Sequence, residues 1–134
     1  MKILVILFLT MFMIGCKADV CQDDKCALSI ALQNNQPQWC NVINDSQTKN
    51  DCFIQLAMKT KNSEYCDAIY HPLDHDDCIL DIAVELGKKN LCEDSMTKNA
   101  EAMCIKAVAV KLEDEYMCEE ILDDRIRDMC IKEV

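Results

Sequence analysis

Residues 65–89, YCDAIYHPLDHDDCILDIAVELGKK, contain two cysteines, Cys66 and Cys78, that stand twelve positions apart. The same spacing recurs with a period of 26 residues, giving the pairs Cys40/Cys52, Cys66/Cys78, Cys92/Cys104 and Cys118/Cys130. A fixed period of this size is typical of repeat proteins, in which each repeat is one small supersecondary unit. We therefore interpret the rest of the chain as further copies of this unit.

Each copy carries two helical patterns joined by a polar connector. An apolar residue precedes the first cysteine, and an isoleucine follows it by three positions at Ile43, Ile69 and Ile121, which predicts a first helix of about two turns. After the second cysteine, apolar residues recur at intervals typical of an amphipathic helix of about three turns. Every full unit has an alanine in this stripe (Ala57, Ala83, Ala109), which suits a close approach between helices.

These patterns predict an all-α fold, a short right-handed-type solenoid of about five disulfide-stapled hairpins. The 2 glycines and 2 prolines leave little material for a turn-rich β-protein. We expect a single repeat domain over residues 20–134. Its units are expected at about residues 20–36, 37–62, 63–88, 89–114 and 115–134.

The 11 cysteines in 134 residues indicate a disulfide scaffold in an exported protein. Antiparallel helices joined by a short connector bring the two cysteines of a unit together, so we infer Cys21–Cys26, Cys40–Cys52, Cys66–Cys78, Cys92–Cys104 and Cys118–Cys130. An alternative joins each second cysteine to the first cysteine of the next unit and strands Cys21 and Cys130. Sequence alone does not decide between the two schemes.

The N-terminus is typical of an export signal. Lys2 is followed by an apolar run over residues 3–14 that is too short to span a bilayer, so we predict a signal peptide at residues 1–15. The run ends in Met-Ile-Gly-Cys at residues 13–16, which resembles the bacterial lipobox. This resemblance implies lipid attachment at Cys16, with residues 16–19 as anchor and linker. The alternative is ordinary secretory cleavage after Ala18.

The lipobox resemblance also implies a location. In enteric bacteria an aspartate after the lipidated cysteine retains lipoproteins in the inner membrane, and this chain has Lys17 there. The expected location is therefore the bacterial cell envelope, at the periplasmic face of the outer membrane. A secreted protein is the alternative.

The repeat pattern itself has a counterpart. The Cys-x11-Cys-x13-Cys spacing over residues 20–134 is similar to the cysteine-paired α-hairpin repeats of exported prokaryotic proteins of unknown role. No activity comes with this resemblance. The formal charge of −10 disfavours nucleic acid and any membrane contact other than the lipid anchor, and it is compatible with a basic protein partner.

The least repeated part of the central unit is the connector Tyr70–Asp77. It holds both histidines of the chain and several acids, so the candidate binding residues are Tyr70, His71, Asp74, His75 and Asp76. Histidines beside carboxylates suit a metal or proton-handling site. We favour a solvated connector whose acids cap the next helix, and we expect no metal, cofactor or catalytic residue, because the cysteines are regular across units and recognisable catalytic motifs are missing from the sequence.

We therefore expect a non-enzymatic envelope lipoprotein that binds another protein, of an inhibitor, exclusion or immunity type. Solenoids use extended surfaces to hold macromolecules, and the acidity of this one favours a basic partner. A structural envelope component without a defined ligand is the alternative, and an enzyme is the least favoured reading.

Overall fold

The computed structural model describes residues 21–134, and these residues contain helices and turns but no strand, which confirms the all-α class. The predicted signal peptide, Cys16 and the linker lie outside the described residues. The helices are α1 (Asp24–Asn34), α2 (Gln38–Asn41), α3 (Ser46–Thr60), η2 (Ser63–Ala68), α4 (Pro72–Leu86), η3 (Lys89–Asp94), α5 (Lys98–Leu112), α6 (Glu115–Glu119) and α7 (Asp124–Glu133). Within residues 21–134 the helices all fall short of the length and apolar character that a membrane crossing requires.

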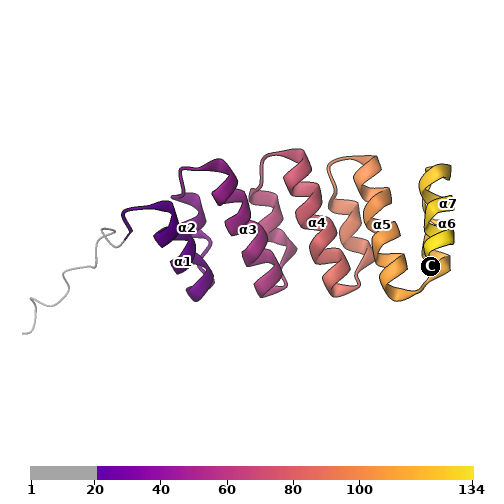
Figure 1. The fold of residues 1–134 in the computed structure, drawn as a ribbon, viewed down its shortest axis with the longest axis horizontal. Coiled ribbons are helices and arrows are strands. Elements are labelled where there is room, and N and C mark those ends of the chain that lie inside the picture. Colours follow the sequence, from indigo (N-terminus) through magenta and orange to yellow (C-terminus); the bar gives the residue numbers. More distant parts are fainter. Residues whose placement is uncertain (1–20) are drawn as a thin grey trace, which may run out of the picture.

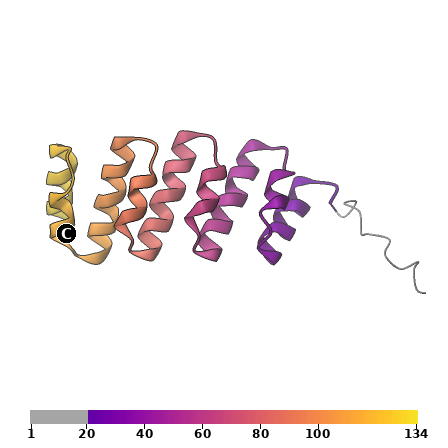
Figure 2. The same ribbon diagram turned by 180° about the vertical axis from the view of Figure 1, so that it is seen from behind.

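The helices form one row of units in chain order (Figures 1 and 2). The short first helix and the long second helix of each unit run side by side, and each second helix also contacts both helices of the following unit. The connectors inside the units follow one edge of the row, the upper edge in Figure 1. The turns between units follow the opposite edge, so the two kinds of loop are separated by the length of a long helix.

Each disulfide joins the two cysteines of one unit. The bridges are Cys21–Cys26, Cys40–Cys52, Cys66–Cys78, Cys92–Cys104 and Cys118–Cys130, with Cα–Cα distances of 5.3 to 5.7 Å. These bridges are the ones inferred from the sequence. The alternative scheme, in which a bridge would join two successive units, is not found among the described residues. Except for the first bridge, both sulfur-bearing residues of every pair are buried, so each cystine is part of the core as well as a cross-link.

The apolar stripe of the long helices builds the rest of the core. Leu56, Ile82 and Val108 occupy the same repeat position and are completely buried. The alanines that follow them, Ala57, Ala83 and Ala109, are also completely buried. A side chain larger than alanine at these positions would force the neighbouring helices apart.

The lengths of the helices differ from the sequence expectation. The first helices contain only four to six residues, and η2 and η3 are 3₁₀ helices, which are common where a helix is too short to complete α-helical hydrogen bonding. The second helices α3, α4 and α5 each contain 15 residues, about four turns rather than three. They are longer because polar residues assigned to the connector form their first turn.

The first unit was expected to be a shortened cap, because Cys21 and Cys26 are only five positions apart, and in the described residues it consists of a single helix, α1. Its bridge ties Cys26 in this helix to Cys21, five residues earlier. In the other units the first helix surrounds the first cysteine, so its counterpart here would fall mostly outside the described residues. The described part of the row therefore contains α1 followed by four hairpins.

Every turn between units starts with a residue in the left-handed conformation. These residues are Asn35, Lys61, Gly87 and Glu113, spaced 26 residues apart, with φ between 54° and 62°. Glycine adopts this conformation without strain, whereas a residue with a Cβ atom is destabilised by about 1 kcal/mol. At Gly87 a Cβ would also lie 3.2 Å from the Leu112 side chain.

We predict that Glu113→Gly raises the free energy of unfolding by about 1 kcal/mol, because it relieves a left-handed residue that has a side chain. The reciprocal control, Gly87→Ala, introduces that strain and the contact with Leu112, and should lower stability. Guanidinium denaturation of the oxidised protein measures both. A loss of stability in Glu113→Gly would show that the turn does not depend on glycine geometry.

Candidate functional site

The four connectors within units have the same three-residue plan, and together they form what we call the connector edge. They cover residues 43–45, 69–71, 95–97 and 121–123. The first side chain of a connector points into the core, as Ile43, Ile69 and Ile121 do. The second residue of each connector is exposed, and the third is the N-cap residue of the second helix of the same unit.

The exposed position carries apolar side chains in three successive units. Tyr70 is 97% exposed, Met96 is 50% exposed and Leu122 is 94% exposed, whereas the first connector has Asn44. The connectors follow one edge of the row (Figure 1), so these three residues recur along that edge, and we call them the apolar ladder. Single exposed apolar residues are ordinary, but their recurrence at one repeat position makes this edge the candidate interaction surface.

The polar candidates of the central unit divide between this edge and the interior. Pro72 is the first residue of α4, where its fixed φ suits a helix start, so the helix begins earlier than expected and only Tyr70 and His71 belong to the connector. Asp74 lies in the first turn of α4, accepts a hydrogen bond from Asn50 at 2.7 Å and lies 3.9 Å from His71 Nδ1. Tyr70, His71 and Asp74 are therefore together at the surface.

His75 and Asp76, in contrast, are buried at 4% and 6% exposure, which corrects the expectation of a solvated connector for these two residues. His75 Nε2 lies 3.8 Å from Asp67 and its Nδ1 lies 3.6 Å from Asp76, and Nδ1 makes no hydrogen bond. Asp76 faces the next unit, where it contacts Met96 and Thr97, whereas His75 lies against Asp67 of its own unit. Among the described residues no group of three or more His, Cys, Asp or Glu side chains is arranged to hold a metal ion.

The carboxylate of Asp76 holds the following unit in place. It accepts hydrogen bonds from the Met96 N–H at 2.6 Å and from the Thr97 hydroxyl at 3.2 Å. Asp24, which stands at the same repeat position, accepts from the N–H groups of Asn44 and Asp45 at 3.0 and 2.9 Å. We call this arrangement the inter-unit clamp, because a carboxylate two residues before the second cysteine caps the next unit's connector.

The clamp is missing at alternate junctions. The same position is Asn50 in the second unit and Ala102 in the fourth. Asn50 donates its amide to Asp74 and Ala102 carries no polar atom, so neither holds the next connector with a carboxylate. Sequence reasoning missed the clamp, although comparing this one position across the units would have shown the alternation.

A surface hollow lies at each junction without a carboxylate clamp. The first, the Tyr70 hollow, has a volume of about 910 Å³ and includes Asn50, Asp67, Tyr70 and Asp74 in its lining. The second, the Ala102 hollow, has a volume of about 360 Å³. Both open on the connector edge, next to the two most exposed members of the apolar ladder.

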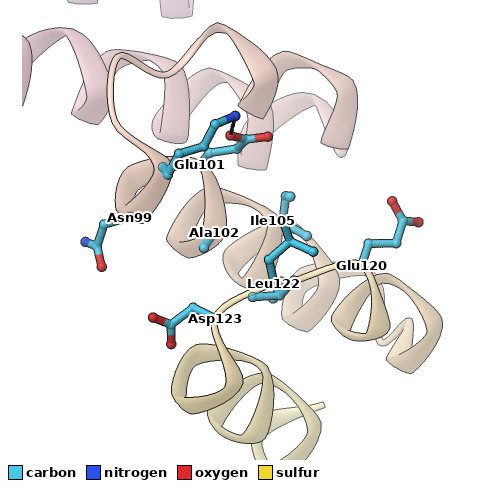
Figure 3. Close-up of a pocket in the computed structure, with 9 residues that line it drawn as sticks. Asn99, Glu101, Ala102, Ile105, Glu120, Leu122 and Asp123 are labelled. Atoms are coloured by element: carbon cyan, nitrogen blue, oxygen red, sulfur yellow. Dashed lines mark hydrogen bonds and ion pairs between the residues drawn. The ribbon is translucent and has the colours of Figure 1, made fainter.

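The Ala102 hollow has an apolar floor and a charged rim (Figure 3). Ala102 and Ile105 of α5 face Leu122 of the last connector across it. Glu101, Glu120 and Asp123 place carboxylates around the opening, with Glu101 paired to the exposed Lys98 at 2.6 Å. Such a site suits a long side chain with an apolar stem and a cationic head.

We predict that Asp76→Ala lowers the free energy of unfolding by about 1–3 kcal/mol, because the Met96 N–H and the Thr97 hydroxyl lose a buried acceptor. The matched control is Asp128→Ala, at the same repeat position in the last unit, where the side chain is exposed. Urea denaturation measures both variants. An equally small change in the two would mean that the clamp contributes nothing to stability.

A second prediction concerns acid. The N–H groups of Asn44 and Asp45 stabilise the carboxylate of Asp24 and lower its pKa below the ordinary 3.8. A lowered folded-state pKa contributes stability above the ordinary value, and this contribution disappears as the pH falls through the folded-state value. The stability difference between wild type and Asp24→Asn should therefore be largest near about pH 7 and shrink towards about pH 2. Denaturation midpoints across this range would contradict it if the difference stayed constant.

Comparison of the chain with known protein families, characterised proteins and solved structures finds no match. The connector edge, with its apolar ladder, its two hollows and the carboxylates around them, is therefore the candidate functional site.

Proposed function

We propose that this protein is a non-enzymatic lipoprotein of the bacterial cell envelope that binds another protein through its connector edge, in an inhibitor, exclusion or immunity role. The observation that carries the proposal is the apolar ladder of Tyr70, Met96 and Leu122, which stands in solvent at one repeated position. Aromatic and apolar anchors of this kind supply most of the binding energy in protein interfaces.

The charge of the edge favours a basic partner. Asp67, Glu93 and Glu119, at the residue after the first cysteine, are all exposed and lie just before the connectors. Asp123 adds a carboxylate in the last connector, and the whole chain has a formal charge of −10. An apolar row flanked by carboxylates attracts and orients a protein surface that carries lysine and arginine.

The five disulfides indicate an oxidising extracellular or envelope environment. The finer proposal is a lipid anchor on Cys16 at the periplasmic face of the outer membrane. It is supported by the lipobox resemblance of residues 13–16 and by Lys17. Such an anchor would keep the row close to the membrane, because the linker ends at residue 19, just before the first unit.

We predict that Tyr70→Ala weakens binding of a stoichiometric envelope partner by about 30-fold, because truncation of a central aromatic anchor removes about 2 kcal/mol or more. The matched control is Tyr116→Ala. Tyr116 is 80% exposed but lies at the start of α6, next to the turns of the opposite edge. Affinity capture from envelope extract with the mature chain identifies the partner, and titration with the purified partner gives the affinities.

Two results would contradict this function. The first is that capture with the mature, oxidised chain returns no stoichiometric protein. The second is that Tyr116→Ala weakens binding as much as Tyr70→Ala does, since the connector edge would then have no special part in recognition.

A further inference from the structure

We propose that the part of the partner recognised by the connector edge is an extended basic segment with two anchor residues about six positions apart, one anchor in each hollow. This inference rests on the proposed protein-binding function and adds the chemistry and spacing of the bound segment. The supporting observation is that two kinds of junction alternate along the row: clamped junctions, at Asp24 and Asp76, and open junctions without a carboxylate clamp, at Asn50 and Ala102.

Three features change together from one junction to the next: the clamp, the exposure of an apolar connector residue and the presence of a hollow. The connector that Asp24 clamps exposes the polar Asn44. The connector that Asp76 clamps exposes Met96, of which half is covered. Where the clamp is absent, the connector exposes almost all of Tyr70 or Leu122, and a hollow lies beside it. Open junctions therefore combine an apolar side chain, a cavity and connector amides that no carboxylate from the preceding helix caps.

The amides give each hollow a place for a peptide backbone. In the first clamped junction the N–H groups of Asn44 and Asp45 point at the carboxylate of Asp24, and in the second the N–H of Met96 and the hydroxyl of Thr97 point at that of Asp76. By the same repeat geometry, the N–H groups of Leu122 and Asp123 face Ala102, which has no oxygen to offer. A carbonyl oxygen of a bound segment would take the position that the carboxylate of Asp24 occupies in the first junction.

The walls of both hollows select a long cationic side chain. The Tyr70 hollow offers the exposed tyrosine ring with Asp67 and Asp74, and the Ala102 hollow offers Leu122 with Glu120. An arginine can lay its stem or its guanidinium plane on the apolar group and pair its head with a carboxylate. The existing ion pair between Lys98 and Glu101 is at the surface, where such pairs contribute little and are readily replaced.

The repeat fixes the distance between the two anchors. Packed helices lie about 8–10 Å apart, so two junctions separated by two units lie about 16–20 Å apart. An extended chain advances about 3.3 Å per residue, which corresponds to about five or six residues. Met96, on the clamped connector between the open ones, would lie under the middle of the segment.

The test uses two capped peptides of identical composition on the full mature, oxidised protein. In acetyl-Gly-Arg-Ser-Ala-Ser-Ala-Ser-Arg-Gly-amide the arginines stand six positions apart, and in the comparison peptide they stand three apart. We expect the first peptide to bind about tenfold more tightly, because only it reaches both hollows at once. Its amide chemical shift changes should centre on Tyr70 and Leu122.

The sharpest variant is Ala102→Asp, which supplies the missing clamp and closes one hollow while adding a negative charge. We expect it to abolish the preference for the six-residue spacing and to weaken binding of that peptide about tenfold, although the added charge alone would favour a basic peptide. The charge-matched control is Gln55→Glu, on the exposed face of α3 and outside both hollows. It should keep the preference and leave the affinity equal or slightly higher.

The inference is overturned if the two peptides bind wild type equally, or if Ala102→Asp strengthens binding as Gln55→Glu does. The comparison of the two peptides on wild type decides the question even if Ala102→Asp fails to fold. Equal peptide affinities, together with a captured partner that still depends on Tyr70, would remove the extended-segment inference and leave the proposed protein-binding function standing.

Discussion

The disulfide inside each unit is the constraint on which the rest of the structure depends. The first helices have only four to six residues, far below the length at which a helix is stable in water by itself. Each is linked through its cysteine to a neighbouring helix of ten or fifteen residues, and in the described hairpins the linked cysteines are buried. One covalent bond thereby replaces the apolar contacts that a longer first helix would make, in a chain with only 5% aromatic residues.

Because the bridges lie within units, the units are held to one another only by packing and by polar contacts. The buried apolar stripe is nearly the same at each junction, but the polar contacts differ. The clamps of Asp24 and Asp76 hold one edge, whereas near the opposite edge Lys59 and Lys111 donate to carbonyl groups at the end of the preceding long helix. The apolar core therefore sets the repeat, and the polar residues distinguish one junction from the next.

This division explains how much of the molecule can be predicted from its sequence. The period, the helical class and the buried alanines follow from residues that repeat in every copy. The pairing of cysteines within units needed the structure to decide it, because both schemes use the same repeated cysteines. The burial of Asp76 does not follow from repeated residues, because it depends on a contact with Met96, 20 residues later in the next unit. The sequence pattern of a single unit contains no information on a contact between units. The burial of His75 was missed because α4 starts at Pro72 and includes this residue. Pro72 was expected in the connector, although proline is equally suited to the first position of a helix, where it lies.

The last junction differs from the clamped ones at two positions, 102 and 122. The carboxylate at position 24 accepts from two connector amides, whereas the alanine at position 102 has no polar atom to offer the amides of the last connector. Leu122 stands beside these amides with 94% of its surface exposed, although the polar Asn44 fits the same position of a clamped connector. Ala102 is buried in one core cluster with Ile121 and Ile126, so it contributes packing at this junction but no cap for the connector. In the proposed function, the uncapped junction and Leu122 would offer an incoming polypeptide amides for its carbonyl groups and apolar surface for its side chains, within reach of carboxylates that favour a basic segment.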